Sequence, residues 1–166
     1  MSELRTSIWE SLLDAEMNVK YWGYLAERFV KKERALKITL SLTTASGLLS
    51  LSVWNSFPAG PVALGVLNTI LACSLPILNY SERIEAMSSL RGSWTQLCIE
   101  FQRVWQQIGS PNSSCENEFR LLKERIVHLS VIETRLPNDR KLVQRCQQEI
   151  IRSHGLIPER EKRDAR

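Results

Sequence analysis

Polar side chains recur at helical spacing in the one long part of this sequence that carries no charge, residues 38–81. In its first half, hydroxyl residues that advance by four, three and four positions fall on one helix face: Thr39, Thr43, Ser46 and Ser50. In its second half, Asn68, Ala72 and Asn79 share a face by the same rule. The chemistry open to these groups is non-covalent, namely hydrogen bonding between helices or contact with water and ions.

Two interpretations fit these polar faces. Small and hydroxyl residues let helices approach closely within a membrane, and asparagine can bond across such an interface, so the first interpretation is helix packing. The second is that several copies assemble and the faces line a wet path, since one two-helix hairpin offers too little surface for a pore. A bare amide is costly in apolar surroundings without a partner or water. Both interpretations therefore predict that something lies against Asn68 and Asn79.

Patterns for covalent or metal-dependent catalysis do not occur. The sequence has no glycine-rich phosphate loop, GxSxG elbow or HExxH motif. The cysteines are widely spaced, without a CxxC pair: Cys73, Cys98, Cys115 and Cys146. This spacing favours free thiols in a reducing compartment. His154 is expected to act as a favourable charge near the end of a helix. We therefore expect no enzyme, no cofactor and no metal.

The uncharged stretch predicts a transmembrane hairpin. The turn-forming residues 55–61 divide it into 38–54 and 62–80, and each segment has about the 17–25 residues that cross a bilayer. Basic residues flank both ends, and none occurs in the loop: Lys31, Lys32, Arg34 and Lys37 precede the hairpin, and Arg83 and Arg91 follow it. Lys and Arg accumulate on the cytoplasmic side, so both termini are expected in the cytoplasm. No secretory signal peptide is expected, because the first residues are charged and amphipathic.

Amphipathic helices are predicted on both sides of the hairpin. In residues 1–37 the apolar positions step by four and three: Ile8, Leu12, Ala15, Val19, Trp22, Ala26 and Phe29. The same heptad rhythm returns at Leu90, Trp94, Leu97, Phe101, Val104 and Ile108. These helices are expected to pack antiparallel and to couple to the hairpin. The residues that we expect to form this coupling seam are Val19, Trp22, Phe29, Leu90, Trp94, Leu97 and Phe101.

The remaining sequence also favours helices. A Gly-Ser-Pro-Asn-Ser-Ser break at 109–114 ends the preceding helix, and a new one is expected from about Ser114. Leu136-Pro137-Asn138 interrupts that helix, and a short helix follows from about Asp139 to Ser153. The predicted fold is all-α: a cytosolic helix (1–37), the hairpin (38–80), cytosolic helices (81–156) and a disordered charged tail (157–166).

A family resemblance rests on the N-terminal helix and its basic end. The segment Tyr21-Trp22-Gly23-Tyr24-Leu25-Ala26-Glu27-Arg28, the run Lys31-Lys32-Glu33-Arg34, the two-span hairpin and the long helix after it resemble the SLATT family. Members are two-transmembrane effectors associated with SMODS nucleotidyltransferases and SLOG sensor domains in bacterial conflict systems. The resemblance covers roughly residues 10–130. It implies an inner-membrane effector of antiphage defence that forms a pore or perturbs the membrane and ends in cell death or dormancy.

Larger family members carry a fused sensor or enzyme domain, and none is expected from this sequence, so its trigger is expected from a nucleotide signal or a separate sensor protein. The expected partners are the lipid bilayer, further copies of the chain and that sensor. A net charge of +4, with Lys and Arg interleaved with Glu, does not predict nucleic-acid binding. The alternatives are a non-conducting two-span scaffold that recruits a cytosolic partner, and a soluble homo-oligomer that buries the hairpin.

Overall fold

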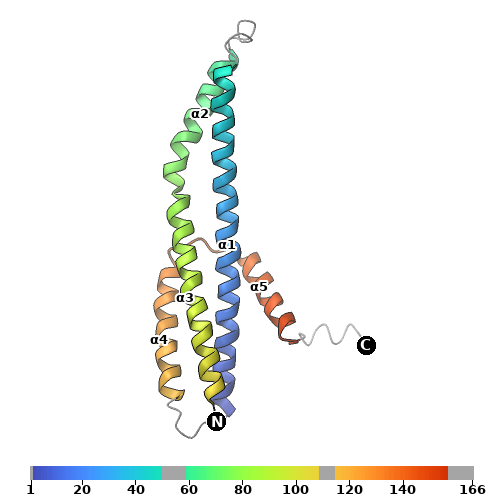
Figure 1. Cartoon of the computed structure of the whole chain (residues 1–166), viewed down its shortest axis with the longest axis vertical. Coiled ribbons are helices and arrows are strands. Elements are labelled where there is room, and N and C mark those ends of the chain that lie inside the picture. Colours follow the sequence, from blue (N-terminus) through green and yellow to red (C-terminus); the bar gives the residue numbers. More distant parts are fainter. Residues whose placement is uncertain (1, 50–58, 109–114, 157–166) are drawn as a thin grey trace, which may run out of the picture. The chain divides into compact units, whose positions relative to one another are not determined.

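The computed structural model describes residues 2–49, 59–108 and 115–156. These ranges form helices α1 (Ser2–Leu49), α2 (Ala59–Leu78), α3 (Tyr80–Gln107), α4 (Cys115–Glu133) and α5 (Arg140–Ser153) (Figure 1). No strand occurs within them. The expected all-α class is therefore confirmed.

Capping residues explain where α5 begins and ends. The Asp139 carboxylate accepts hydrogen bonds from the backbone N–H groups of Lys141 and Leu142, at 3.0 and 3.1 Å, and so caps the first turn. Beyond the last turn, Gly155 adopts a left-handed φ of +67°, a conformation that glycine enters without steric cost. These ends match the short helix expected from Asp139 to Ser153.

The structure differs from the sequence prediction at both ends of the second apolar segment. Ala59–Pro61, expected in the loop 55–61, belong to the first turn of α2. Proline is tolerated there because its missing N–H would have no helical partner at that position. Helix α2 then ends at Leu78 rather than residue 80. The expected loop residues 55–58, residues 50–54 of the first apolar segment and the expected tail 157–166 lie outside the described residues.

The chain divides into two compact units. We call Met1–Leu25 with Ala86–Arg166 the core unit, and Ala26–Glu85 the hairpin unit. Helix α1 contributes to both units, and so does α3.

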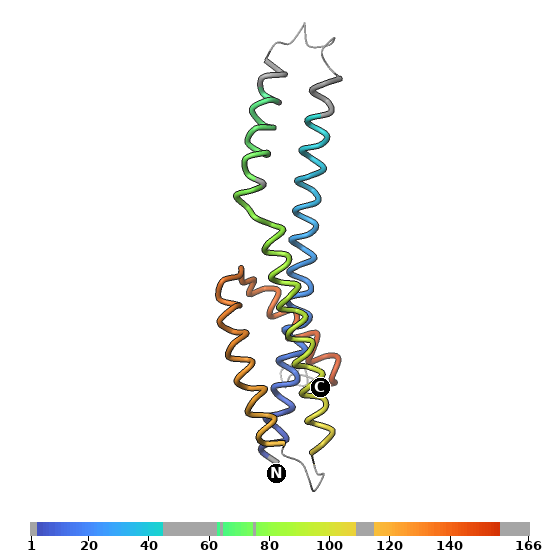
Figure 2. Tube along the Cα trace, turned by 60° about the vertical axis from the view of Figure 1, so that its left-hand side comes forward, coloured from blue at the N-terminus to red at the C-terminus, as the bar shows by residue number. Residues whose placement is uncertain are grey.

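The core unit is built on an antiparallel pair formed by α1 and α3. Figure 2 shows the first half of α1 and the second half of α3 side by side. The rings of Trp9 and Trp105, from the start of α1 and the end of α3, lie 5.3 Å apart between centroids. Thirteen positions further along α1, Trp22 shares a hydrogen-bond acceptor with Trp94 of α3. Many of the buried side chains occupy the predicted heptad positions: Ile8, Leu12, Ala15, Trp22, Leu90, Trp94, Leu97, Phe101 and Val104. Within the core unit, the heptad period and the antiparallel pairing are confirmed.

Helices α4 and α5 cover different sides of this pair. Helix α4 contacts α3, where Phe119 meets Phe101 edge-on and Arg125 pairs with Glu100. Helix α5 contacts α1 and buries Leu142, Cys146 and Ile150, one residue per turn. On α1 it meets a second line of buried side chains, among them Tyr21, that the heptad analysis did not select.

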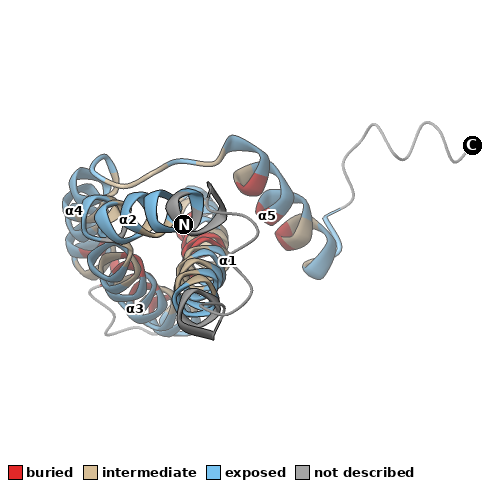
Figure 3. Cartoon of the chain, turned by 90° about the horizontal axis from the view of Figure 1, so that it is seen from above, coloured by how far each residue is buried: buried red, intermediate tan, exposed pale blue. Residues whose placement is uncertain are grey.

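The hairpin unit is packed much more thinly. The second part of α1 runs antiparallel to α2 and the start of α3, because Thr43 contacts Asn68 of α2 while Phe29, earlier on α1, stacks edge-on against Tyr80, the first residue of α3. Of its described side chains only Ala26 is buried, and α2 carries exposed and intermediate colours in Figure 3. Large aliphatic side chains are exposed on both helices: Ile38, Leu42, Val66, Leu67, Ile70 and Ile77. In the part of the chain that the structure describes, no helix combines the length and the apolarity needed to cross a membrane.

The core unit's packing gives a stability prediction. Phe101 is fully buried, so Phe101→Ala should lower the free energy of unfolding by about 3–5 kcal/mol, through lost burial and the cavity left behind. Urea titration of the full-length protein, followed by tryptophan fluorescence, measures this loss. The adjacent exposed residue supplies the control, and Gln102→Ala should change stability by less than about 0.5 kcal/mol. Equal losses at the two positions would contradict this assignment of the core.

Candidate functional site

The two predicted polar faces meet inside the hairpin unit. The Thr43 hydroxyl donates a hydrogen bond to Oδ1 of Asn68, and Nδ2 of Asn68 donates to Oγ1 of Thr44 at 3.3 Å. The amide of Asn68 therefore has partners for both its oxygen and its nitrogen within one chain. Thr44, which lies next to the predicted face rather than on it, completes this contact.

The other hydroxyls of this region bond to their own helices. Thr39 donates to the carbonyl of Ala35 at 2.9 Å, Thr44 donates to Leu40 at 2.8 Å, and on α2 Thr69 donates to Gly65 at 2.9 Å. Such bonds satisfy a hydroxyl without water and let it lie in apolar surroundings. The described contacts therefore favour the packing interpretation of the polar faces, because none of these groups needs a wet path.

The remaining predicted polar residues are not gathered at this contact. Thr39 and Ala72 are exposed, the side chain of Ser46 lies outside the described residues, and so does Ser50 as a whole. Asn79 lies between α2 and α3 with φ +44°, and its amide donates to Glu82. Because a left-handed residue interrupts the helical repeat, Asn79 does not continue the face of Asn68 and Ala72. Asparagine is one of the few residues that adopts this conformation readily.

In the core unit, a carboxylate is shared by two tryptophans. Oε1 of Glu133, the last residue of α4, accepts hydrogen bonds from Nε1 of Trp22 at 3.0 Å and from Nε1 of Trp94 at 2.7 Å. Both indoles are buried, and a buried indole N–H requires an acceptor. One half-buried side chain thus joins α1, α3 and the end of α4.

The neighbouring residue Tyr21 holds the connection between α4 and α5. Its hydroxyl donates to Oδ1 of Asn138 at 3.3 Å and accepts a bond from the backbone N–H of Asp139 at 3.0 Å. Burial raises the pKa of Tyr21 above its ordinary value, which keeps the hydroxyl protonated and able to donate. Its ring also meets that of Trp22 edge-on, with 4.9 Å between centroids.

Two residues that follow Trp22 in the sequence contact other helices: Tyr24 binds α5, and Gly23 lies against α3. The Tyr24 hydroxyl donates to Glu149 at 3.1 Å, which raises the pKa of Tyr24. Arg145 bonds Glu149 at 3.0 Å and lowers the pKa of that carboxyl. Between the two tyrosines, Gly23 lets the guanidinium of Arg91 approach, since a Cβ there would lie 3.3 Å from its Nε. We call Tyr21, Trp22, Tyr24 and Trp94, with their acceptors, the aromatic clamp.

The residues predicted to form the coupling seam lie in different surroundings. Leu90, Leu97 and Phe101 are buried as expected, Val19 is half-buried, and Phe29 is half-buried in the hairpin unit. Trp22 and Trp94 belong to both the seam and the clamp. The acceptors Glu133, Asn138 and Glu149 were not predicted from the sequence. The signal for Glu133 was the pair of buried indoles, each of which needs an acceptor.

The other titratable side chains are at ordinary structural positions. His154, expected only as a charge at a helix end, lies with Nε2 2.7 Å from Oε2 of Glu16, and its ring meets Trp9 edge-on. The four cysteines are free thiols, and burial raises the pKa of Cys98 to about 11. Within residues 2–49, 59–108 and 115–156, no three potential metal ligands come together.

Comparison of the chain with protein-family models, with curated proteins and with solved structures finds no significant match. The resemblance to the SLATT family thus stays a prediction from the residues quoted above.

The shared acceptor should couple each of the two tryptophans energetically to Glu133. Trp22→Phe and Trp94→Phe each lose a hydrogen bond to a charged group, worth about 1.5–3 kcal/mol. In a Glu133→Ala background both costs should fall, because the acceptor is already gone. A double-mutant cycle on urea unfolding measures the difference. Trp105→Phe provides the matched control, and its cost should be the same with and without Glu133. If the stability cost of each of the three Trp→Phe substitutions were the same with and without Glu133, the shared hydrogen bonds of the aromatic clamp would be refuted.

The raised pKa of Tyr21 predicts a loss of stability in alkaline solution. A group whose pKa is higher in the folded state contributes stability that is complete below its unfolded pKa, about 10, and is lost as the pH rises through its folded value. The difference in unfolding free energy between the wild type and Tyr21→Phe should therefore be constant up to about pH 10 and shrink above it. Urea titrations at a series of pH values check this. A difference that grows with alkaline pH would contradict the assignment.

Proposed function

We propose that this chain is a membrane effector of a bacterial antiphage or conflict system, inserted through its hairpin unit and controlled through its core unit. The observation that carries the proposal is the contrast between the two units. The core unit leaves some large aliphatic side chains exposed, such as Ile99 and Val127, but it also buries many others. In the hairpin unit no described large apolar side chain is buried, and Leu42 is 66 % and Ile77 79 % exposed. Large contiguous apolar patches are rare on soluble monomers and mark membrane or protein contacts.

Lipid is the environment that best accounts for these exposed side chains. Burying one such aliphatic side chain is worth about 1.5–3 kcal/mol, and hydroxyls that bond to their own helices carry no penalty in lipid. No described helix is long and apolar enough to span a membrane. The insertion proposal therefore rests on the exposed aliphatic side chains, the uncharged sequence 38–81 and the basic residues that flank it. That charge distribution supports cytoplasmic termini.

Control of the hairpin would pass through the helices that both units share. Helix α1 is continuous from Ser2 to Leu49, and the aromatic clamp occupies the residues just before Ala26, where the hairpin unit begins. A nucleotide or sensor protein that displaced Glu133 or α5 would break hydrogen bonds of the aromatic clamp and so release aromatic side chains of α1. In this proposal, several copies then assemble through their hairpins and form a pore or perturb the inner membrane.

A second candidate is a non-conducting scaffold that recruits a cytosolic partner. The contact of Asn68 with Thr43 and Thr44 favours it, because polar groups satisfied inside one hairpin need no aqueous path.

One expression experiment separates these functions. The chain is expressed in a bacterium from a tight promoter, and membrane potential is followed with a dye beside growth and alkaline carbonate extraction. An effector should resist extraction and depolarise the cell. In the pore form of the proposal, Asn68→Leu abolishes depolarisation, while Asn79→Gly, which keeps the left-handed turn, leaves it intact.

The remaining outcomes decide against the effector or against its pore form. Release by carbonate without detergent would refute membrane insertion and support the soluble homo-oligomer. Firm insertion with an undisturbed potential, in both the wild type and a Glu133→Ala variant that opens the clamp, would support the scaffold. Depolarisation that survives Asn68→Leu would refute a pore that depends on this amide and leave general membrane perturbation.

A further inference from the structure

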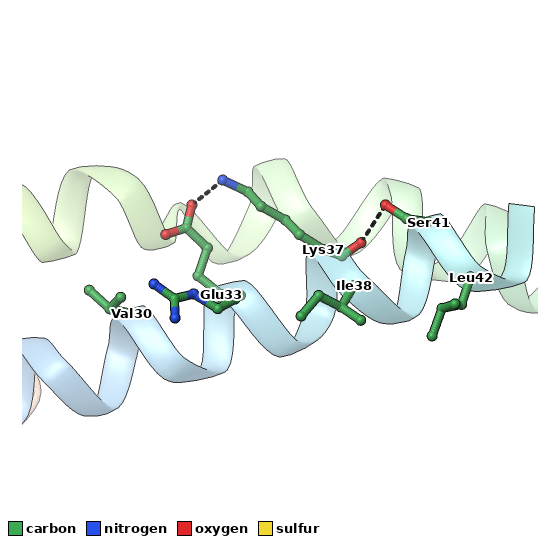
Figure 4. A pocket seen from close by; sticks show the side chains of 7 residues that line it. Val30, Glu33, Lys37, Ile38, Ser41 and Leu42 are labelled. Carbon is green, nitrogen blue, oxygen red and sulfur yellow. Dashed lines mark hydrogen bonds and ion pairs between the residues drawn. The ribbon is translucent and has the colours of Figure 1, made fainter. Parts of the chain in front are cut away.

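A shallow hollow lies on α1 where the charged sequence gives way to the uncharged one. Its lining comes from about three turns of this helix, and Figure 4 shows the side chains from Val30 to Leu42. Toward the N-terminal side it carries Arg34 and Lys37, and one turn further Ile38 and Leu42. All four are exposed. Cationic and apolar groups thus follow each other along one helix, within reach of a single amphiphilic molecule.

The carboxylate in this hollow is already occupied. Glu33 lies 2.7 Å from Nζ of Lys37 and accepts a hydrogen bond from Ser81 at 2.9 Å. The bond from Lys37, and after it the bond from Ser81, lower the pKa of Glu33. Only 16 % of its side chain is exposed, against 63 % for Lys37. The negative charge is therefore turned away from solvent, and the ammonium of Lys37 is the more accessible member of the pair.

Arg34 is the cation that is open to a ligand. Among the described residues, nearby basic side chains have partners, since Lys31 pairs with Glu27 at 2.8 Å and Lys32 lies over the ring of Phe29. No described residue forms a hydrogen bond or ion pair with Arg34. A guanidinium presents a planar fork of donors that matches two oxygens of a phosphate.

We propose that this hollow binds an anionic phospholipid such as phosphatidylglycerol, an inference that rests on the membrane insertion proposed above. The phosphate accepts two hydrogen bonds from the guanidinium of Arg34 and is attracted by the positive charge of Lys37. An acyl chain lies along Ile38 and Leu42. A zwitterionic lipid binds more weakly, because its own ammonium or choline group is repelled by the same cations. The site sets the headgroup level at Arg34–Lys37, one turn before the aliphatic side chains.

Native mass spectrometry of the purified full-length protein in detergent micelles tests the site. Phosphatidylglycerol and phosphatidylcholine with identical acyl chains are titrated separately, and bound lipids are counted. The wild type should bind phosphatidylglycerol about fivefold more tightly, the preference expected from one cation at the headgroup. Arg34→Gln should bind phosphatidylglycerol and phosphatidylcholine with nearly equal affinity. The control Arg120→Gln removes an exposed cation from α4 and should keep the wild-type preference.

Two results would overturn the site: equal affinities in the wild type, or an undiminished preference in Arg34→Gln. Carbonate extraction of the same variants separates this failure from failure of the proposed function. A wild type that resists extraction but shows no lipid preference refutes the phospholipid site alone. A wild type released by carbonate refutes insertion, and the lipid site falls with it.

Discussion

The core unit depends on the carboxylate of Glu133. Two buried indole N–H groups, from Trp22 and Trp94, converge on one of its oxygens at 3.0 and 2.7 Å. A buried donor left without an acceptor costs about 1–3 kcal/mol, so these tryptophans can be buried only where α4 ends at this glutamate. The end of α4 in turn places the linker that Tyr21 binds and the Asp139 cap from which α5 starts. One acceptor therefore ties together the positions of all four helices in this unit.

The hairpin unit follows the opposite principle. Among its described residues, the polar contacts between helices are those of Asn68 with Thr43 and Thr44 and of Ser81 with Glu33, and hydroxyls such as those of Thr39 and Thr69 bond to carbonyls of their own helix. Its aliphatic side chains find almost no partners within the chain. Polar groups that are satisfied internally and apolar groups that are left open suit a solvent of acyl chains, in which an unsatisfied hydrogen bond is far costlier than an exposed isoleucine.

The helices and one face of the core could be predicted from the sequence, because burial imposes a period that Ile8, Leu12, Trp94 and Phe101 display directly. The second buried line on α1 could not, since Tyr21 looks like a surface residue until the linker between α4 and α5 supplies its hydrogen bonds. The polar faces were predicted only in part. Spacing put Asn68 on a polar face without identifying what lies against it. It also assigned Asn79 to the same helix, because a left-handed residue at a helix junction leaves no periodic signal. The partners of Trp22 and Trp94 required knowledge of which helix end lies nearby.

Helix α1 joins the two kinds of stabilisation in one unbroken element. Before Ala26 its aromatic side chains bind acceptors from α4, the α4–α5 linker and α5, and beyond Lys37 its aliphatic side chains remain exposed. In water the buried apolar side chains of the first half are stabilised, whereas the exposed aliphatic side chains of the second half are unfavourable. In the function proposed above, a change of solvent along the helix satisfies both halves without breaking a backbone hydrogen bond. The residues between them are the basic run from Lys31 to Lys37, whose charges favour a headgroup layer over either water-free acyl chains or a packed protein interior. The order of residues along α1 is therefore itself the argument for where a membrane surface would lie.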